Sequence, residues 1–123
     1  LDGGVYSGHD LILTAINIYL TNIVVFALIY WEMDGGGPGK RKSSPRSERD
    51  FLFPQDNLHQ PPSHPWIPTF VDYLYVSSTN ATAFSPTDTM PLLRRTKMLM
   101  LAQSLISLLT IALIAGRAVN VLK

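Results

Sequence analysis

Two long apolar runs dominate the pattern of hydrophobic and polar positions along the chain. Residues 11–31 and residues 98–116 contain no charged side chain, so neither shows the charged face that is typical of a helix on a water-soluble domain. At about 1.5 Å per residue, each run would form a helix roughly 30 Å long, which matches the hydrocarbon core of a bilayer. The pattern predicts transmembrane helices at 11–31 and 97–119 in an integral membrane protein, with a bacterial-type plasma membrane as its expected location.

Two other interpretations of the apolar runs are less favourable. As buried helices of a soluble protein, both runs would have to be covered by the remaining segments, which are short and rich in Pro and Gly. As a cleaved signal peptide, the first run lacks a basic lead-in, exceeds the usual apolar length and has no small-residue cleavage pattern after it. Both alternatives therefore fit the chain less well than two membrane spans.

The segment between the two predicted helices changes composition several times. Residues 32–68 contain a glycine-rich stretch that starts at Asp34, a charged run (KRKSSPRSERD) and a proline-rich stretch, which together predict a flexible connector. Residues 69–82 fit a short helix or a strand, because Val, Tyr and Thr dominate. Residues 83–91 are rich in turn-forming residues. We interpret residues 1–123 as a single membrane domain.

Composition and charge exclude several classes of function. The net charge of +1 gives no bulk attraction to nucleic acid, and the absence of cysteine excludes disulfides and thiolate sites. No Ser/His/Asp arrangement and no pair of carboxylates on a shared scaffold is visible, so we expect no enzyme. His59 and His64 lack the regular spacing of metal ligands, and Arg41 replaces the Ser or Thr that follows the lysine of a phosphate-binding loop. Neither a metal nor a cofactor is therefore expected.

Polar residues recur on one side of each predicted helix. They are Asp10, Thr14, Asn17 and Thr21 at the first helix, and Gln103, Ser107, Thr110 and Arg117 in the second. Such a stripe can line a wet path or a seam between helices, whereas hydroxyl groups can also bond back to their own helix. Amide side chains are costlier in lipid, so we expect Asn17, Asn22 and Gln103 to face protein.

The order of residues after the connector is specific. Thr79-Asn80-Ala81-Thr82 ends a short amphipathic segment, Asp88 and Pro91 follow, and basic residues then lead into the apolar run that ends near Gly116. This order, from Tyr73 to Val119, resembles the pore module of two-transmembrane pore-loop ion channels of the potassium-channel family. In that family a pore helix ends in Thr-x-x-Thr and is followed by the selectivity filter, an acid, a proline and the inner helix.

The resemblance implies an all-α membrane protein with two transmembrane helices and a short re-entrant pore-type helix and loop, here residues 69–91, before the second. It also implies a tetramer in the lipid bilayer, with a monovalent cation as the permeant ion. The positions that match the pore helix and filter are Thr79, Thr82, Ala83, Phe84, Ser85, Pro86, Thr87 and Asp88. Gln103, Ser107 and Thr110 would line the inner helix, and Gly116 would be its hinge.

One departure from the family affects the filter itself. Where the family has Gly-Tyr-Gly, this chain has Phe84-Ser85-Pro86-Thr87, and Pro86 has a fixed φ and no amide hydrogen. We therefore expect a channel-like protein that conducts cations with non-standard selectivity; the alternative is a non-conducting membrane scaffold or accessory protein. Residues 32–97 hold eight of the ten Lys and Arg residues, which favours a cytoplasmic connector, whereas a pore-loop channel requires it outside. The topology stays open.

Overall fold

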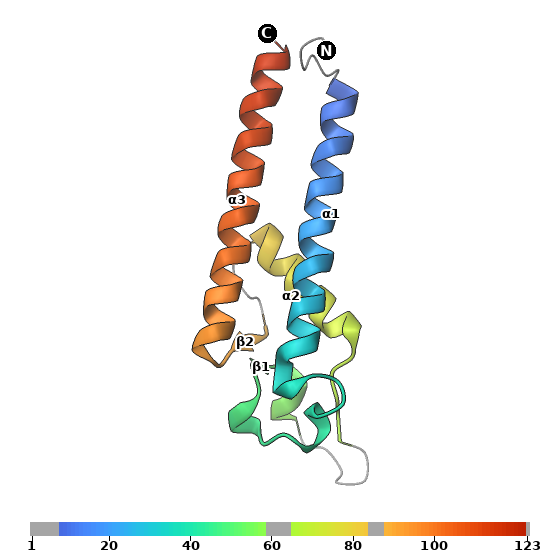
Figure 1. Cartoon of the computed structure of the whole chain (residues 1–123), viewed down its shortest axis with the longest axis vertical. Coiled ribbons are helices and arrows are strands. Elements are labelled where there is room, and N and C mark those ends of the chain that lie inside the picture. Colours follow the sequence, from blue (N-terminus) through green and yellow to red (C-terminus); the bar gives the residue numbers. More distant parts are fainter. Residues whose placement is uncertain (1–7, 59–64, 84–87, 123) are drawn as a thin grey trace.

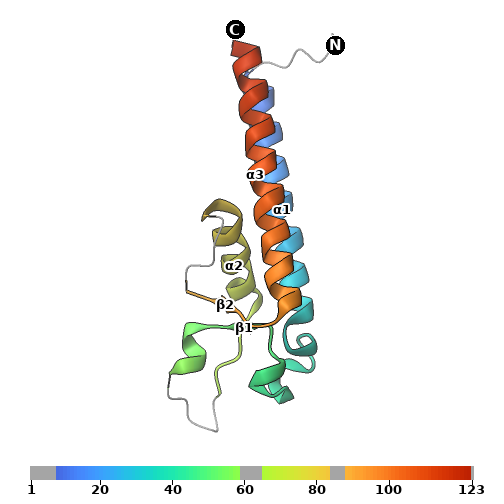
Figure 2. The same cartoon turned by 90° about the vertical axis from the view of Figure 1, so that its left-hand side faces the viewer.

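Two long antiparallel helices form the main body of the protein. The computed structural model describes residues 8–58, 65–83 and 88–122, and within them α1 (Gly8–Met33) and α3 (Arg94–Leu122) lie side by side (Figures 1 and 2). Both helices are long and apolar enough to cross a membrane, as the sequence predicts. Each extends by two or three residues beyond its predicted bounds at either end.

The outer surfaces of α1 and α3 are apolar in the single chain. Large hydrophobic side chains stay exposed along both helices, including Leu13, Leu20, Val25, Leu105, Leu109 and Leu113. Burying each such side chain away from water is worth about 1.5–3 kcal/mol, so a surface of this kind favours lipid over water. The surface agrees with a membrane location for the two helices.

The connector forms a cap at the end of the molecule where α1 ends and α3 begins (Figure 1). It consists of short 3₁₀ turns, η1 (Asp34–Gly36), η2 (Arg41–Ser43), η3 (Arg46–Glu48) and η4 (Pro54–Asn57), and of strand β1 (Phe51–Leu52). β1 pairs antiparallel with β2 (Met90–Pro91), which directly precedes α3. The described part of the connector is thus more ordered than its composition predicts, because its charged and aromatic residues find partners in the rest of the chain.

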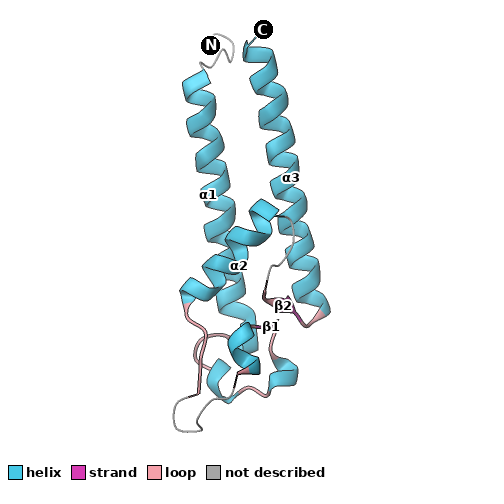
Figure 3. Cartoon of the chain, turned by 180° about the vertical axis from the view of Figure 1, so that it is seen from behind, coloured by secondary structure: helices cyan, strands magenta, loops and turns pink. Residues whose placement is uncertain are grey.

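A third helix, α2 (Phe70–Ala83), packs against both long helices. The sequence fits either a helix or a strand here. The structure contains a helix, and its inner face buries Tyr73, Val76, Ser77, Asn80 and Ala81. These positions follow the three- and four-residue spacing of one helical face. Figure 3 shows α2 running from the connector end of the molecule to about the middle of α1 and α3.

An aromatic core joins the connector to the helices. Its buried members are Tyr30, Phe51, Phe53, Tyr73, Val76 and Met100. The rings of Phe51 and Tyr30 meet edge to face with centroids 5.3 Å apart, and those of Phe53 and Tyr73 do so at 5.4 Å. Such pairs add to the burial of apolar area and fix the mutual orientation of their elements. The core therefore holds α1, α2 and β1 in one arrangement.

Candidate functional site

The carboxyl end of α2 is bound to the middle of both long helices. The carbonyl oxygen of Ala81 accepts hydrogen bonds from the hydroxyl groups of Tyr19, at 3.0 Å, and Ser107, at 2.5 Å. Tyr19 lies near the midpoint of α1, and Ser107 lies near the midpoint of α3. One turn earlier, Ser77 Oγ donates to the carbonyl of Ile23 at 2.7 Å. These bonds fix the depth at which α2 ends relative to the two long helices.

Gln103 is the centre of a buried polar network that joins all three helices. Its side chain is fully buried, and its Oε1 accepts from Tyr30 OH at 2.7 Å and from Asn80 Nδ2 at 2.9 Å. Its Nε2 donates to Ser77 Oγ at 2.8 Å and to Asn22 Oδ1 at 3.1 Å. In a membrane such bonds replace those that water would supply. The network thus makes the position of α2 specific as well as stable.

A second buried polar cluster centres on Asp34, directly after α1. Asp34 Oδ1 accepts from the backbone amides of Asp50 at 2.7 Å and Phe51 at 3.3 Å, and Oδ2 accepts from Tyr73 OH at 2.5 Å. Burial raises the pKa of the Tyr73 phenol, and the charge of Asp34 raises it further, so this phenol stays protonated and donates. The cluster attaches the connector to the first turn of α2.

Asp50 connects the same region to α3. Arg95 donates to both carboxylate oxygens of Asp50 at 2.8 Å, and Thr96 Oγ1 donates to Oδ1 at 2.6 Å. The carbonyl of Asp50 accepts from the amide of Leu92 at 2.8 Å. Asp50 is fully buried, whereas the Arg95 side chain is 58% exposed; the bonds to the carboxylate are charge-assisted, which makes them shorter and stronger than neutral ones. The start of α3 is therefore anchored to the strand that follows Asp50.

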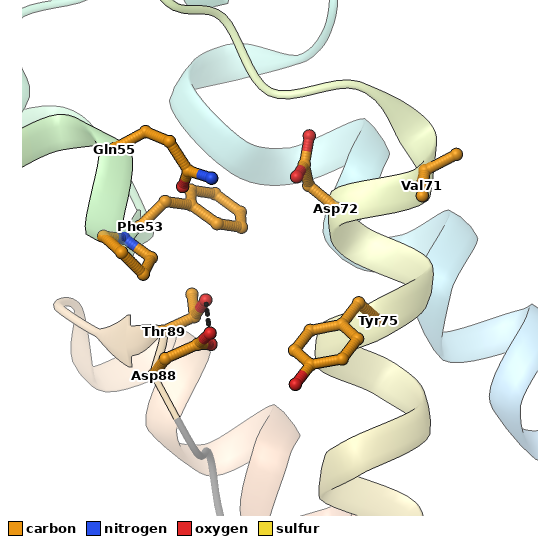
Figure 4. A pocket seen from close by; sticks show the side chains of 8 residues that line it. Phe53, Gln55, Val71, Asp72, Tyr75, Asp88 and Thr89 are labelled. Carbon is orange, nitrogen blue, oxygen red and sulfur yellow. Dashed lines mark hydrogen bonds between the residues drawn. The ribbon is translucent and has the colours of Figure 1, made fainter.

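A cavity of about 280 Å³ lies beside the first half of α2, between η4 and β2 (Figure 4). Two carboxylates, Asp72 and Asp88, line it together with Tyr75 and Phe53. Asp72 also caps α2, because its Oδ2 accepts from the backbone amide of Thr69 at 2.7 Å. Asp88 is exposed, and its Oδ1 accepts from Thr89 Oγ1 at 3.2 Å. Of the two carboxylates, Asp88 therefore accepts fewer hydrogen bonds from the described residues.

No family model, no curated protein and no solved structure matches this chain. The likeness to pore-loop channels stays a prediction.

The residues predicted for the pore helix end lie at the carboxyl end of α2. The hydroxyl of Thr79 donates to the carbonyls of Tyr75 and Val76 at 3.0 Å, and that of Thr82 donates to Ser78 O. Thr82 and Ala83 are exposed in the single chain. Phe84, Ser85, Pro86 and Thr87 lie outside the described residues, and Asp88 lines the cavity beside α2.

The predicted inner-helix positions divide into two groups. Gln103 and Ser107 are buried inside one chain against α1 and α2, which confirms that Gln103 faces protein. Thr110 Oγ1 donates to Ile106 O within its own helix at 2.7 Å. Gly116 lies within α3, which continues to Leu122, so its role as a hinge stays a prediction. Asn17 is exposed on the single chain, and its carbonyl accepts from Thr21 at 2.8 Å.

Several residues that organise the site were not singled out from the sequence. Asp34 and Asp50 sat in a segment expected to be flexible, and their partners lie up to 46 residues away. Tyr30, near the end of the first predicted helix, is buried and donates a hydrogen bond to Gln103. The sequence around Asp34, an acid followed by three glycines, predicts the end of a helix and does not mark a buried carboxylate. Among the described residues, no group of three or more His, Cys, Asp or Glu is arranged to hold a metal ion.

Proposed function

We propose that this chain is a channel-like integral membrane protein in which α2 enters the bilayer from one side and ends near its middle. Copies assemble, with four as the number that the resemblance implies, so that the carboxyl ends of their α2 helices surround a shared path. The path conducts monovalent cations with non-standard selectivity. Two helices of one chain cannot enclose such a path alone, so the assembly is part of the proposal.

The observation that carries the proposal is the pair of hydrogen bonds on Ala81 O from Tyr19 and Ser107. When α1 and α3 cross a hydrocarbon layer of about 30 Å, residues at their midpoints lie near its centre. The end of α2 then lies at the same depth. Asp88, five residues beyond Ala83, lines a cavity with Val71 from the first turn of α2, so the chain returns to the side from which α2 started.

Backbone that leaves a helix inside a membrane needs protein or water around it. Non-helical backbone at membrane depth is tolerated where it is buried in protein or lines a water-filled cavity. In the single chain the far face of α2 is open, with Val71 69% and Tyr75 51% exposed and Thr82 and Ala83 exposed at its end. Further copies of the chain would supply the missing cover.

The charge distribution favours a cation as the permeating species. The carboxyl end of a helix carries a partial negative charge, and α2 directs this end toward the middle of the long helices. The carboxylate of Asp88, which lines the cavity beside α2, adds negative charge at the mouth of the proposed path. Rings of acidic side chains serve the same purpose in cation channels.

One observation favours the alternative, a non-conducting scaffold with the same fold. Gln103 and Ser107 were predicted to line the path from the inner helix. Both make their hydrogen bonds within one chain. A path would then have to be lined by the end of α2 and by the other faces of α3. The experiment below separates the two functions.

The decisive experiment is cation flux into liposomes that contain the purified chain. We expect K⁺ or Na⁺ flux from a stable oligomer. Asp88→Asn should lower this flux at low ionic strength, and the difference should fade near 1 M salt, where the screening length is about 3 Å. Glu48→Gln, which removes an exposed acid in η3, is the matched control and should leave flux unchanged. A stable, correctly inserted protein without flux in any of these salts would refute the channel and leave the scaffold.

A further inference from the structure

A cavity with surplus positive charge lies in the connector, next to the end of α1. The buried carboxylate of Asp34 faces two guanidinium groups: Arg41 Nε lies 3.9 Å from its Oδ2, and Arg49 Nε lies 3.5 Å from its Oδ1. Both carboxylate oxygens already accept shorter hydrogen bonds from backbone amides and from Tyr73. One carboxylate therefore faces two cations, and it meets neither of them at the distance of a short charge-assisted hydrogen bond.

Arg41 has several partners within the fold. Its Nε donates to Asp34 O at 3.0 Å, its Nη2 donates to Trp31 O, and its guanidinium lies 4.8 Å from the ring centroid of Tyr73. The carbonyls of Trp31 and Asp34 belong to the last turn of α1 and to η1, where a cation also meets the negative end of the helix. Arg41 is thus accounted for by the fold.

Arg49 is not accounted for in this way. Its side chain is only 13% exposed, and its Nε and Nη2 are buried without a hydrogen bond within the described residues. Leaving buried donors of a charged group without a hydrogen bond costs more than the 1–3 kcal/mol of a neutral one, and the ion pair with Asp34 at 3.5 Å supplies no such bond. Buried polar groups of this kind nearly always have a partner, and an ion or water is the usual one where protein supplies none.

The space beside Arg49 suits an anion. Among the described residues, a cavity of about 210 Å³ is lined by Arg41, Lys42, Ser44 and Arg49, and by one acid, Asp56. Trp66 and Ile67 form its apolar wall. The guanidinium of arginine binds two oxygens of a phosphate side by side, and lysine adds a point charge. Among the described lining residues three cations face one acid, and with the buried carboxylate of Asp34 counted as well, one positive charge remains in excess.

We propose that this cavity binds a phosphate group, with Arg49 as the principal partner and Lys42 beside it. The cavity adjoins the last turn of α1, which places it at headgroup level when α1 spans a bilayer, and Trp66 suits the boundary between headgroups and acyl chains. An anionic phospholipid supplies phosphate at that level. A soluble phosphate offers the same chemistry, so the test has one arm for each source. The site does not depend on conduction.

The experiment measures lipid retention by the full-length chain in detergent, using native mass spectrometry with phosphatidic acid or phosphatidylcholine. We expect phosphatidic acid to bind in preference, and Arg49→Gln to weaken its binding about 10-fold or more, as the loss of a charged hydrogen bond predicts. Arg94→Gln is the matched control, since it removes an exposed cation at the same end of the molecule but outside the cavity. The affinity of the Arg94→Gln variant for phosphatidic acid should stay within about 2-fold of that of the unchanged chain.

Further arms keep the proposal falsifiable. If Arg49→Gln fails to fold, the exposed Lys42→Gln takes its place, with a smaller loss of binding expected. Inorganic phosphate at millimolar concentration should compete with phosphatidic acid; competition without any preference among the lipids would assign the site to a soluble phosphate. The proposal is overturned if Arg49→Gln and Lys42→Gln both match Arg94→Gln, or if neither lipid nor phosphate binds.

Discussion

Replacing Gln103 by leucine tests whether the buried network really holds α2 between the long helices. The substitution keeps the side chain similar in size and removes all its hydrogen bonds. Ser77 Oγ retains Ile23 O, and Asn80 Nδ2 retains Met100 O. Tyr30 OH loses its 2.7 Å bond, and Asn22 Oδ1 loses its 3.1 Å bond. Two polar groups are therefore deprived of the bonds that the folded chain gave them.

The size of the expected destabilisation follows from the two groups that lose a hydrogen bond, Tyr30 OH and Asn22 Oδ1. An unsatisfied buried polar group costs about 1–3 kcal/mol in soluble proteins, and hydrogen bonds between membrane helices average about 0.6 kcal/mol with a maximum near 1.7. Gln103→Leu should therefore lower the free energy of unfolding by about 1–3 kcal/mol. Thr110→Val is the control on the same helix, because within the described part of the chain its hydroxyl bonds to Ile106 O of α3 itself, and it should cost less than about 0.5 kcal/mol.

The assay is reversible unfolding in mixed micelles, with denaturing detergent as the variable and tryptophan fluorescence as the signal. A double-mutant cycle with Tyr30→Phe isolates one bond, since removing both partners should restore part of the loss. We expect a coupling energy of about 0.6–1.7 kcal/mol. If Gln103→Leu is no more costly than Thr110→Val, the reasoning about the network is wrong.

Two further predictions concern the connector and use the same unfolding assay. Gly37 has φ +101° and ψ 174°, and a Cβ there would lie 2.9 Å from the carbonyl oxygen of Glu32. Gly37→Ala should therefore lower the free energy of unfolding by about 1–3 kcal/mol. Gly39→Ala, whose Cβ meets no described atom within 4 Å, should be nearly neutral. Equal effects of the two substitutions would argue against this backbone conformation. Phe51→Ala removes a buried ring from the aromatic core and should cost about 3–5 kcal/mol; a loss below 1 kcal/mol would mean that the connector does not pack on the helices.

The two long helices could be predicted from the sequence because their signal is local. A charge-free run of membrane length needs no knowledge of distant residues, and it located α1 and α3 to within a few positions at each end. The type of α2 was ambiguous by composition, since β-branched and aromatic residues dominate it. The helical spacing of Tyr73, Val76 and Asn80 was the better indicator, and tertiary packing decided the outcome.

The polar partnerships could not be predicted because they join residues far apart in the chain. Asp34 meets Tyr73, and Asp50 meets Thr96, across loops whose paths no local pattern specifies. The polar stripe on α3 was recognised, but which of its members turns toward α1 and α2 depends on the position of α2. Gln103 and Ser107 do so, whereas Thr110 bonds within its own helix.

The depth at which α2 ends is the central claim, and spin labels in lipid bilayers measure it directly. Labels at Ala83 and at the exposed Leu108, next to Ser107, should report similar depths near the middle of the bilayer from their accessibility to oxygen and to a polar nickel complex. A label at Val71, at the start of α2, should lie about 10 Å or more nearer the surface, since 12 helical residues span about 18 Å along a tilted axis. Labels at Ala83 and Val71 that share one depth at the membrane surface would contradict the account.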